Sequence, residues 1–237
     1  MLKKIIFGIY ISIAATTASA NGFPEQMGKI AMDGYINLPS PGSLILVKRN
    51  GEIITFSGNG RYMIRGAIYD MWNGGKRIHS LNEGKNSARR IRFNNMEKVL
   101  EDAATIDVGN GHGKLVLVFV DLSSEPSMKL LKKLKGIKGY RFKVVIMAAV
   151  DKESAKKAKG LMCLKKSNPE QAKNALLSGN ISFVPDGECG KEALMKTLIL
   201  AKMFGITRVP MLVAPNGEPL FGDSNNIEEF LKENSHG

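Results

Sequence analysis

The sequence predicts an α/β fold, α+β overall, in which a small antiparallel N-terminal domain precedes a larger domain with a buried sheet. Three observations support this. The Asn-Gly pairs at 50–51 and 59–60 separate short apolar runs, as hairpin turns do. An uninterrupted apolar run at 115–120 indicates a strand covered on both faces. A second such run at 142–150 follows an amphipathic segment, which predicts a right-handed βαβ unit.

The first twenty residues have the pattern of a cleavable signal peptide. Lys3 and Lys4 precede an apolar run over 5–15, and Ala18-Ser19-Ala20 has the small-x-small form of a cleavage site. We expect cleavage after Ala20 and export of the remaining 217 of 237 residues. The alternative is a short amphipathic anchor or an ordinary first helix. No later stretch is apolar for long enough to cross a bilayer, so stable membrane insertion is not expected.

Composition excludes several classes of protein. Apolar residues make up 43% of the chain and charged residues 24%, which is ordinary for a globular protein and argues against disorder. The formal net charge of +12 favours anionic partners, but for an exported protein we do not expect nucleic acid. The three histidines (His79, His112 and His236) are scattered, so we expect neither a metal nor another cofactor.

The chain has two cysteines, Cys163 and Cys189, and no C-x-x-C motif. In an oxidising compartment an isolated pair most simply forms one structural disulfide. The alternative is two buried free thiols.

Residues 21–82 are predicted to form the N-terminal domain. We expect a short helix at about 25–34, then strands within 44–56 and one strand over 61–70, together an antiparallel meander spanning 42–80. A sheet this small has one apolar face and needs a helix or a second subunit to cover it.

Residues 83–112 are predicted to connect the two domains. Apolar residues at near-helical spacing over 86–106 indicate a linker helix, which ends before a flexible joint at 109–113. The alternative is that this helix packs on the second domain.

Residues 113–237 are predicted to fold as β-α-β, a mostly helical insertion at about 153–204, and then β-β-α. The final three elements are a strand at 211–214, a strand at 220–222 and a helix at 226–234, with a Pro215-Asn216-Gly217 turn between the strands. This order of elements is that of the thioredoxin fold.

Over essentially the whole mature length the chain resembles the periplasmic DsbC/DsbG thiol-disulfide isomerases. The similarity rests on the segments Tyr62–Asp70, Phe119–Leu122, Cys163–Lys166 and Asn174–Gly179, on Cys189, and on Phe204–Pro210, in that order. The resemblance implies a periplasmic homodimer formed through the N-terminal domain, a non-catalytic Cys163–Cys189 disulfide, and a cis-proline at Pro210. It also implies protein disulfide isomerase activity.

One departure affects that activity. Where the family has C-x-x-C, this chain has Ser124-Glu125-Pro126-Ser127. Thiol-disulfide exchange needs an attacking thiolate and a sulfur that can leave, and a serine hydroxyl supplies neither. We expect Ser124 to cap the following helix, with Pro126 and Glu125 suited to its first turn. A serine nucleophile is the alternative, but no sequence motif indicates a base for it.

Peptide binding does not require sulfur. The resemblance implies that Val209, which precedes Pro210, offers its backbone to an extended peptide. The alternative is a purely structural cis bond. The stretch 129–143 carries seven basic residues and no acidic one, and is either the solvated face of a helix or a docking surface for an acidic partner or anionic lipid.

The sequence therefore predicts a DsbC-like exported protein that binds unfolded or partly folded exported proteins as a chaperone, and we expect it to have no catalytic activity. One alternative is an assembly factor that docks in a conjugative or secretion apparatus of the cell envelope. The other is an active isomerase, which requires Cys163 and Cys189 to be redox-active or the serines to replace original cysteines.

Overall fold

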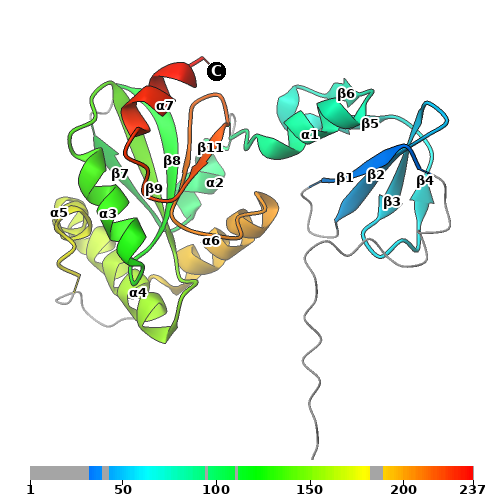
Figure 1. The fold of residues 1–237 in the computed structure, drawn as a ribbon. Helices are drawn as coiled ribbons and strands as arrows, with labels where there is room; N and C mark the ends of the chain where they lie inside the picture. The colour runs from blue at the N-terminus through cyan, green and yellow to red at the C-terminus, as the bar shows by residue number, and fades with distance from the viewer. Residues whose placement is uncertain (1–31, 39–42, 94–95, 110–111, 182–188, 237) are drawn as a thin grey trace, which may run out of the picture.

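The computed structural model describes residues 32–38, 43–93, 96–109, 112–181 and 189–236, so the expected signal peptide at 1–20 lies outside the described residues. Figure 1 shows a smaller N-terminal unit, running from β1 to α1, and a larger unit that holds the remaining elements. In chain order the elements are β1 (Gly34–Leu38), β2 (Leu44–Arg49), β3 (Glu52–Ser57), β4 (Met63–Ile64), β5 (Ile68–Asp70), the short 3-10 helix η2 (Met71–Asn73), β6 (Lys76–Ile78), α1 (Leu81–Arg89), α2 (Glu97–Asp102), β7 (Thr105–Gly109), β8 (Lys114–Asp121), α3 (Glu125–Leu134), β9 (Tyr140–Met147), α4 (Lys152–Ser167), α5 (Pro169–Ser178), α6 (Lys191–Met203), β10 (Met211–Val213), β11 (Pro219–Phe221) and α7 (Ile227–Glu233).

The N-terminal unit is built on an antiparallel sheet of order β1-β2-β3-β4. Asn50 and Gly51 both have positive φ, +51° and +81°, the backbone that a tight two-residue hairpin turn requires. The predicted Asn-Gly hairpin is therefore confirmed. The second predicted turn is also present, closed by the Gly60 N–H, which donates to the Ser57 carbonyl at 2.7 Å.

Helix α1 covers one face of this sheet. The helix begins where the Ser80 hydroxyl accepts a hydrogen bond from the Glu83 N–H, at 3.1 Å. Gly84 lets it approach closely, because a Cβ there would lie 2.5 Å from Ile36 Cδ1 and 3.0 Å from Leu46 Cδ1. The cover that a small sheet needs is thus supplied by a helix of the same chain.

Three expectations for this unit are wrong. Residues 32–34, the described part of the helix expected at 25–34, are not helical, and Gly34 begins strand β1. Residues 25–31 lie outside the described residues. The single strand expected over 61–70 is divided into β4 and β5 by an irregular segment in which Gly66 has φ of +152°. The meander is therefore two sheets, because β5 pairs with β6 instead of β4.

The single linker helix expected over 86–106 is also wrong. Helix α1 ends at Arg89, α2 is short, and strand β7 follows. In β7, Ile106 and Val108 are buried while Asp107 between them is exposed, a period of two that places the apolar residues on one face of a strand. Strand β7 pairs antiparallel with β9, so the larger sheet begins at Thr105, before the expected domain start at 113.

The larger sheet has the order β11-β10-β8-β9-β7. Strands β8 and β9 are parallel and joined through α3, which confirms the predicted βαβ unit. Strand β10 pairs antiparallel with both β8 and β11, which confirms the predicted final hairpin. The expected insertion holds α4, α5 and α6, while its residues 182–188 lie outside the described residues.

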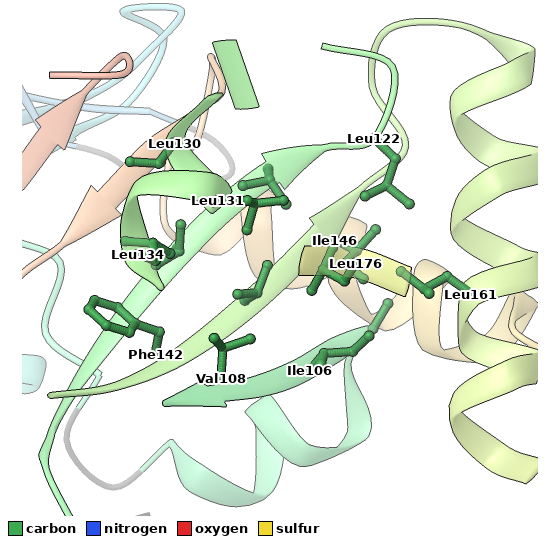
Figure 2. Close-up of a cluster of buried hydrophobic side chains, with 14 of the residues drawn as sticks. Ile106, Val108, Leu122, Leu130, Leu131, Leu134, Phe142, Ile146, Leu161 and Leu176 are labelled. Carbon is green, nitrogen blue, oxygen red and sulfur yellow. The ribbon is translucent and has the colours of Figure 1, made fainter. Parts of the chain in front are cut away.

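Both faces of this sheet are buried, as its apolar runs predict. In Figure 2 the leucines of α3 lie over one face, with Leu161 of α4 and Leu176 of α5 in the same cluster. The opposite face packs against α2 and α6 through Leu100, Leu200 and Phe204. Within the described residues, no helix is long and apolar enough to span a bilayer.

We predict that a hydroxyl on α6 fixes the start of β7. The Ala104 N–H donates to the buried Thr197 Oγ1 at 2.7 Å. Thr197→Val keeps the shape of the side chain but leaves the buried Ala104 N–H without an acceptor. We therefore expect urea denaturation to show a free energy of unfolding lower by about 1–3 kcal/mol. Thr197→Ser keeps the hydroxyl and is the control. A Thr197→Val variant as stable as the wild type would show that the hydrogen bond to Ala104 does not stabilise the fold.

Candidate functional site

The N-terminus of α3 lies directly beyond β8 and carries the tetrapeptide Ser124–Ser127. The Ser127 N–H donates to Ser124 Oγ at 3.4 Å, and Pro126 and Glu125 occupy the first turn. Ser124 therefore caps the helix, as predicted. Its hydroxyl accepts one of the N–H groups that have no partner within the helix.

Ser127 is fully buried, and its hydroxyl is also used structurally. The backbone N–H of Asp121 donates to Ser127 Oγ at 3.2 Å. Among the described residues, no hydrogen bond joins either serine hydroxyl to a histidine or a carboxylate. The geometry that activates a serine nucleophile is therefore not formed within the described chain.

The carboxylate of Asp121 holds this end of the sheet together. It is completely buried at the end of β8. Its Oδ1 accepts from the Ser123 N–H at 2.8 Å, and its Oδ2 accepts from the N–H groups of Ala149 and Val150 and from Ser154 Oγ at 2.6 Å. A buried carboxylate is tolerated only when hydrogen bonded, and this one ties the loops after β8 and β9 to the start of α4.

Charges on the exposed side of α3 are paired. Glu125 Oε1 lies 2.8 Å from Lys129 Nζ, one turn along the helix. This hydrogen bond with Lys129 lowers the pKa of Glu125 and raises the pKa of Lys129. The negative charge of Asp223 opposes this lowering of the Glu125 pKa. Asp223 belongs to the loop after β11, which therefore lies beside α3.

The second part of the site is the segment before β10. The Val209–Pro210 peptide bond is cis, as the resemblance implies. The Pro210 carbonyl accepts from the Gly222 N–H at 2.9 Å. Continuing the register in which Met211 pairs with Phe119 brings Val209 level with Asp121, so this segment meets the end of β8 that leads to Ser124.

Val209 itself lies outside β10, and no hydrogen bond from its N–H or C=O reaches another described residue. Its side chain is half-buried and packs against the face of the sheet that α6 covers. The Val209 segment therefore has one backbone donor and one acceptor without a partner among the described residues, at a half-buried position.

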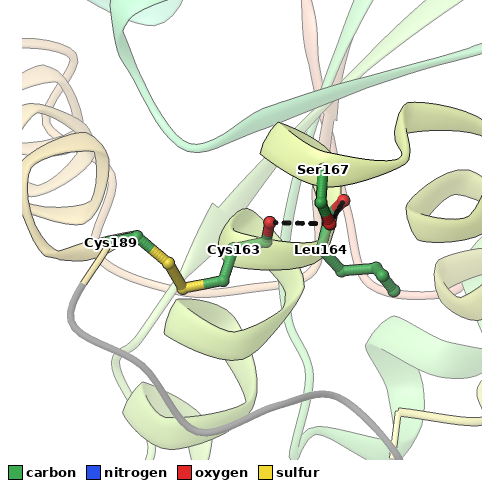
Figure 3. The surroundings of a disulfide bond; sticks show 4 residues. All are labelled: Cys163, Leu164, Ser167 and Cys189. Atoms are coloured by element: carbon green, nitrogen blue, oxygen red, sulfur yellow. Dashed lines mark hydrogen bonds between the residues drawn. A yellow bond between two sulfur atoms is a disulfide. The ribbon is translucent and has the colours of Figure 1, made fainter.

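The predicted Cys163–Cys189 disulfide is present, with the two Cα atoms 5.4 Å apart. Figure 3 shows it joining α4 to the segment that leads into α6, beside the hydrogen bond from Ser167 Oγ to the Cys163 carbonyl. Because the chain has two cysteines, neither is a free thiol. Cys163 follows Ser154, which contacts Asp121, by nine residues, or roughly 13 Å along α4. The disulfide is therefore remote from the tip of α3.

The basic stretch at 129–143 is used in several ways. Lys132, Lys135 and Lys138 are exposed, as the solvated-face interpretation expects. Lys133 instead donates to the backbone carbonyls of Asp223 and Ser224. Lys143 is buried and pairs with Asp107 at 3.0 Å. In the described part of the chain, no group of three or more His, Cys, Asp or Glu side chains could hold a metal ion.

A cavity of about 410 Å³ lies where the two units meet. Trp72 of η2 contacts Phe204 edge to face, with ring centroids 5.3 Å apart, and Phe204 contacts Phe119 of β8 in the same way at 6.3 Å. The N-terminal unit is therefore connected by edge-to-face ring contacts to the strand that leads to Ser124.

Two solved structures resemble this arrangement at the level of the fold. The catalytic domain of Proteus mirabilis ScsC matches with 19% identity and a TM-score of 0.50, covering 60% of this chain and 96% of that one. Proteus mirabilis ScsC in a compact conformation matches with 18% identity and a TM-score of 0.51, covering 61% and 80%. The chain has a thioredoxin-like fold. No protein-family model matches it, and no curated protein matches it significantly.

In this thioredoxin-like fold, sequence reasoning found Ser124, Ser127, Val209 and Pro210, and the structure brings both segments to one end of the sheet. It missed Asp121, whose signal was an acidic residue directly after an apolar strand. It also missed the contact between Arg208 and Phe221, whose ring centroid lies 4.0 Å from the Arg208 guanidinium. No sequence signal connects those two residues.

We predict that the cap at Ser124 contributes measurably to stability. Ser124→Ala removes the acceptor for the Ser127 N–H and should lower the free energy of unfolding by about 1 kcal/mol in urea denaturation. Ser124→Asp restores an acceptor and adds a charge that favours a helix N-terminus, so it should match or exceed the wild type. An alanine variant as stable as the wild type would contradict a capping role.

Proposed function

We propose that this chain is a DsbC/DsbG-like exported protein that binds extended segments of unfolded or partly folded proteins and does not exchange thiols. A single observation supports the proposal. The backbone N–H and C=O of Val209 have no partner among the described residues, and the tip of α3 at the same end of the sheet carries hydroxyls and no thiols. Pairing with an extended peptide needs only the backbone groups, whereas exchange needs sulfur.

The surroundings of Val209 suit a peptide. The loop after β9 exposes Val150, and β11 ends on the exposed ring of Phe221. These apolar groups lie at the end of the sheet that also holds the tip of α3. A bound segment would therefore gain apolar contact beside its backbone hydrogen bonds.

The proposal includes a periplasmic location and a homodimer. The signal-peptide pattern at 1–20 supports export. The last strand of the small sheet, β4, exposes the side chains of both Met63 and Ile64 beside Tyr62. An apolar edge strand of this kind is a template for pairing with another chain, which supports a second copy there.

The first test measures redox chemistry. We predict that the wild type does not catalyse insulin reduction by dithiothreitol, because no thiol lies at the tip of α3. Ser124→Cys/Ser127→Cys should gain this activity, because a helix N-terminus lowers the pKa of a cysteine thiol. Ser124→Ala/Ser127→Ala is the control. Reductase activity in the wild type comparable to that of the cysteine variant would overturn the proposal.

The second test measures backbone pairing by fluorescence polarisation. A labelled peptide of alternating Val and Thr, which favours an extended conformation, should bind the wild type. The same peptide with an N-methyl group on every residue cannot donate to the Val209 carbonyl and should bind at least tenfold more weakly.

Equal binding of the two peptides, or no binding of either, would contradict pairing at Val209. Recovery of one stoichiometric envelope protein in a pull-down, together with absence of peptide binding, would favour the assembly-factor alternative.

A further inference from the structure

Arg208 stands beside the proposed peptide-binding position in an unusual setting. It immediately precedes Val209, is exposed, and holds its guanidinium 4.0 Å from the centroid of the Phe221 ring. Phe221 ends β11 and pairs with Met211, the residue after the cis-proline. Its position is thus fixed by the sheet, and the ring is a platform for the guanidinium.

The stacked geometry leaves the donors of Arg208 unused. A guanidinium over an aromatic face interacts through its plane, so its N–H groups still point outward from its edge. Among the described residues, no ion pair or hydrogen bond engages the Arg208 side chain. Because the ring restricts the side chain, less conformational entropy is lost when those donors bind a partner.

Two acidic residues at this end of the sheet, Glu125 and Asp223, form no ion pair with Arg208. Glu125 is paired with Lys129 across the tip of α3. The loop that carries Asp223 is held by Lys133, whose Nζ also donates to Asn225 Oδ1 at 2.8 Å. Asp223 lies close enough to Glu125 to oppose the lowering of its pKa, but forms no ion pair with Arg208.

We propose that Arg208, stacked on Phe221, selects peptides with an acidic side chain close to the residue that pairs with Val209. The inference rests on the proposed function, since it assigns a preference to the same binding position. A carboxylate matches the fork of N–H donors on a guanidinium. Successive residues of an extended chain are about 3.3 Å apart. A peptide side chain that is one or two positions away from the residue paired with Val209 therefore lies within reach of an arginine.

The test uses three labelled Val-Thr peptides that differ only in a central Glu, Gln or Lys, measured by fluorescence polarisation. For the wild type we expect the Glu peptide to bind about three- to tenfold more tightly than the Gln peptide, the range of an exposed but preorganised ion pair. The Lys peptide should bind most weakly. The preference for Glu should shrink as salt is added.

Variants separate Arg208 from the general positive charge of the protein. Arg208→Gln should bind the Glu and Gln peptides equally, and Phe221→Leu should reduce the preference by freeing the guanidinium. Lys202→Gln removes the same charge from an exposed position on α6 and should keep the wild-type preference. A loss of preference in Lys202→Gln equal to that in Arg208→Gln would overturn the proposal.

The outcomes for the inference and for the proposed function are distinguishable. If no peptide binds the wild type, the proposed function fails and the inference fails with it. If the Glu and Gln peptides bind the wild type equally, peptide binding stands and selection by Arg208 is overturned. If Arg208→Gln keeps the preference for Glu, another cation is responsible and Arg208 has no such role.

Discussion

The buried carboxylate of Asp121 is the contact on which the candidate site depends. Strands β8 and β9 are parallel, so their carboxyl ends meet at one edge, where backbone N–H groups would otherwise lack partners. Asp121 accepts from the loops after both strands and from the first turn of α4. A single side chain thereby fixes the direction in which α3 leaves the sheet, and with it the place of Ser124.

The serine hydroxyls at the tip of α3 limit the chemistry that this place can perform. A helix N-terminus stabilises a thiolate, but a hydroxyl there remains protonated near neutral pH. The hydroxyls of Ser124 and Ser127 instead serve the backbone: one caps α3, and the other accepts from Asp121. The proposed recognition of peptides rests on the backbone groups of Val209, which have no partner among the described residues, and its proposed preference rests on the Arg208 guanidinium stacked on Phe221.

The N-terminal unit is connected to this site through aromatic contacts. Trp72 packs on Phe204, which follows α6 and leads into the segment that ends at Pro210. Phe204 in turn packs on Phe119 of β8. These contacts join the smaller unit both to β8 and to the segment that leads to Val209.

The sequence by itself determined the elements whose signals are local. Apolar runs long enough to need cover on both faces gave β8 and β9, the turn chemistry of Asn50-Gly51 gave the first hairpin, and the absence of cysteine at 124 and 127 excluded thiol chemistry there. The lone cysteine pair also indicated the disulfide.

The tertiary structure alone determined which strand or sheet each segment with an ambiguous sequence pattern packs against. Residues 105–109 have apolar residues compatible with helix or strand, and only the free edge of β9 makes them a strand. Helix α1 joined the small sheet because Gly84 fits against Ile36 and Leu46, contacts far apart in sequence. Arg208 contacts Phe221 because β10 and β11 pair, which brings their ends together. Such choices depend on surfaces that exist only after the chain has folded, which is why local patterns could not reveal them.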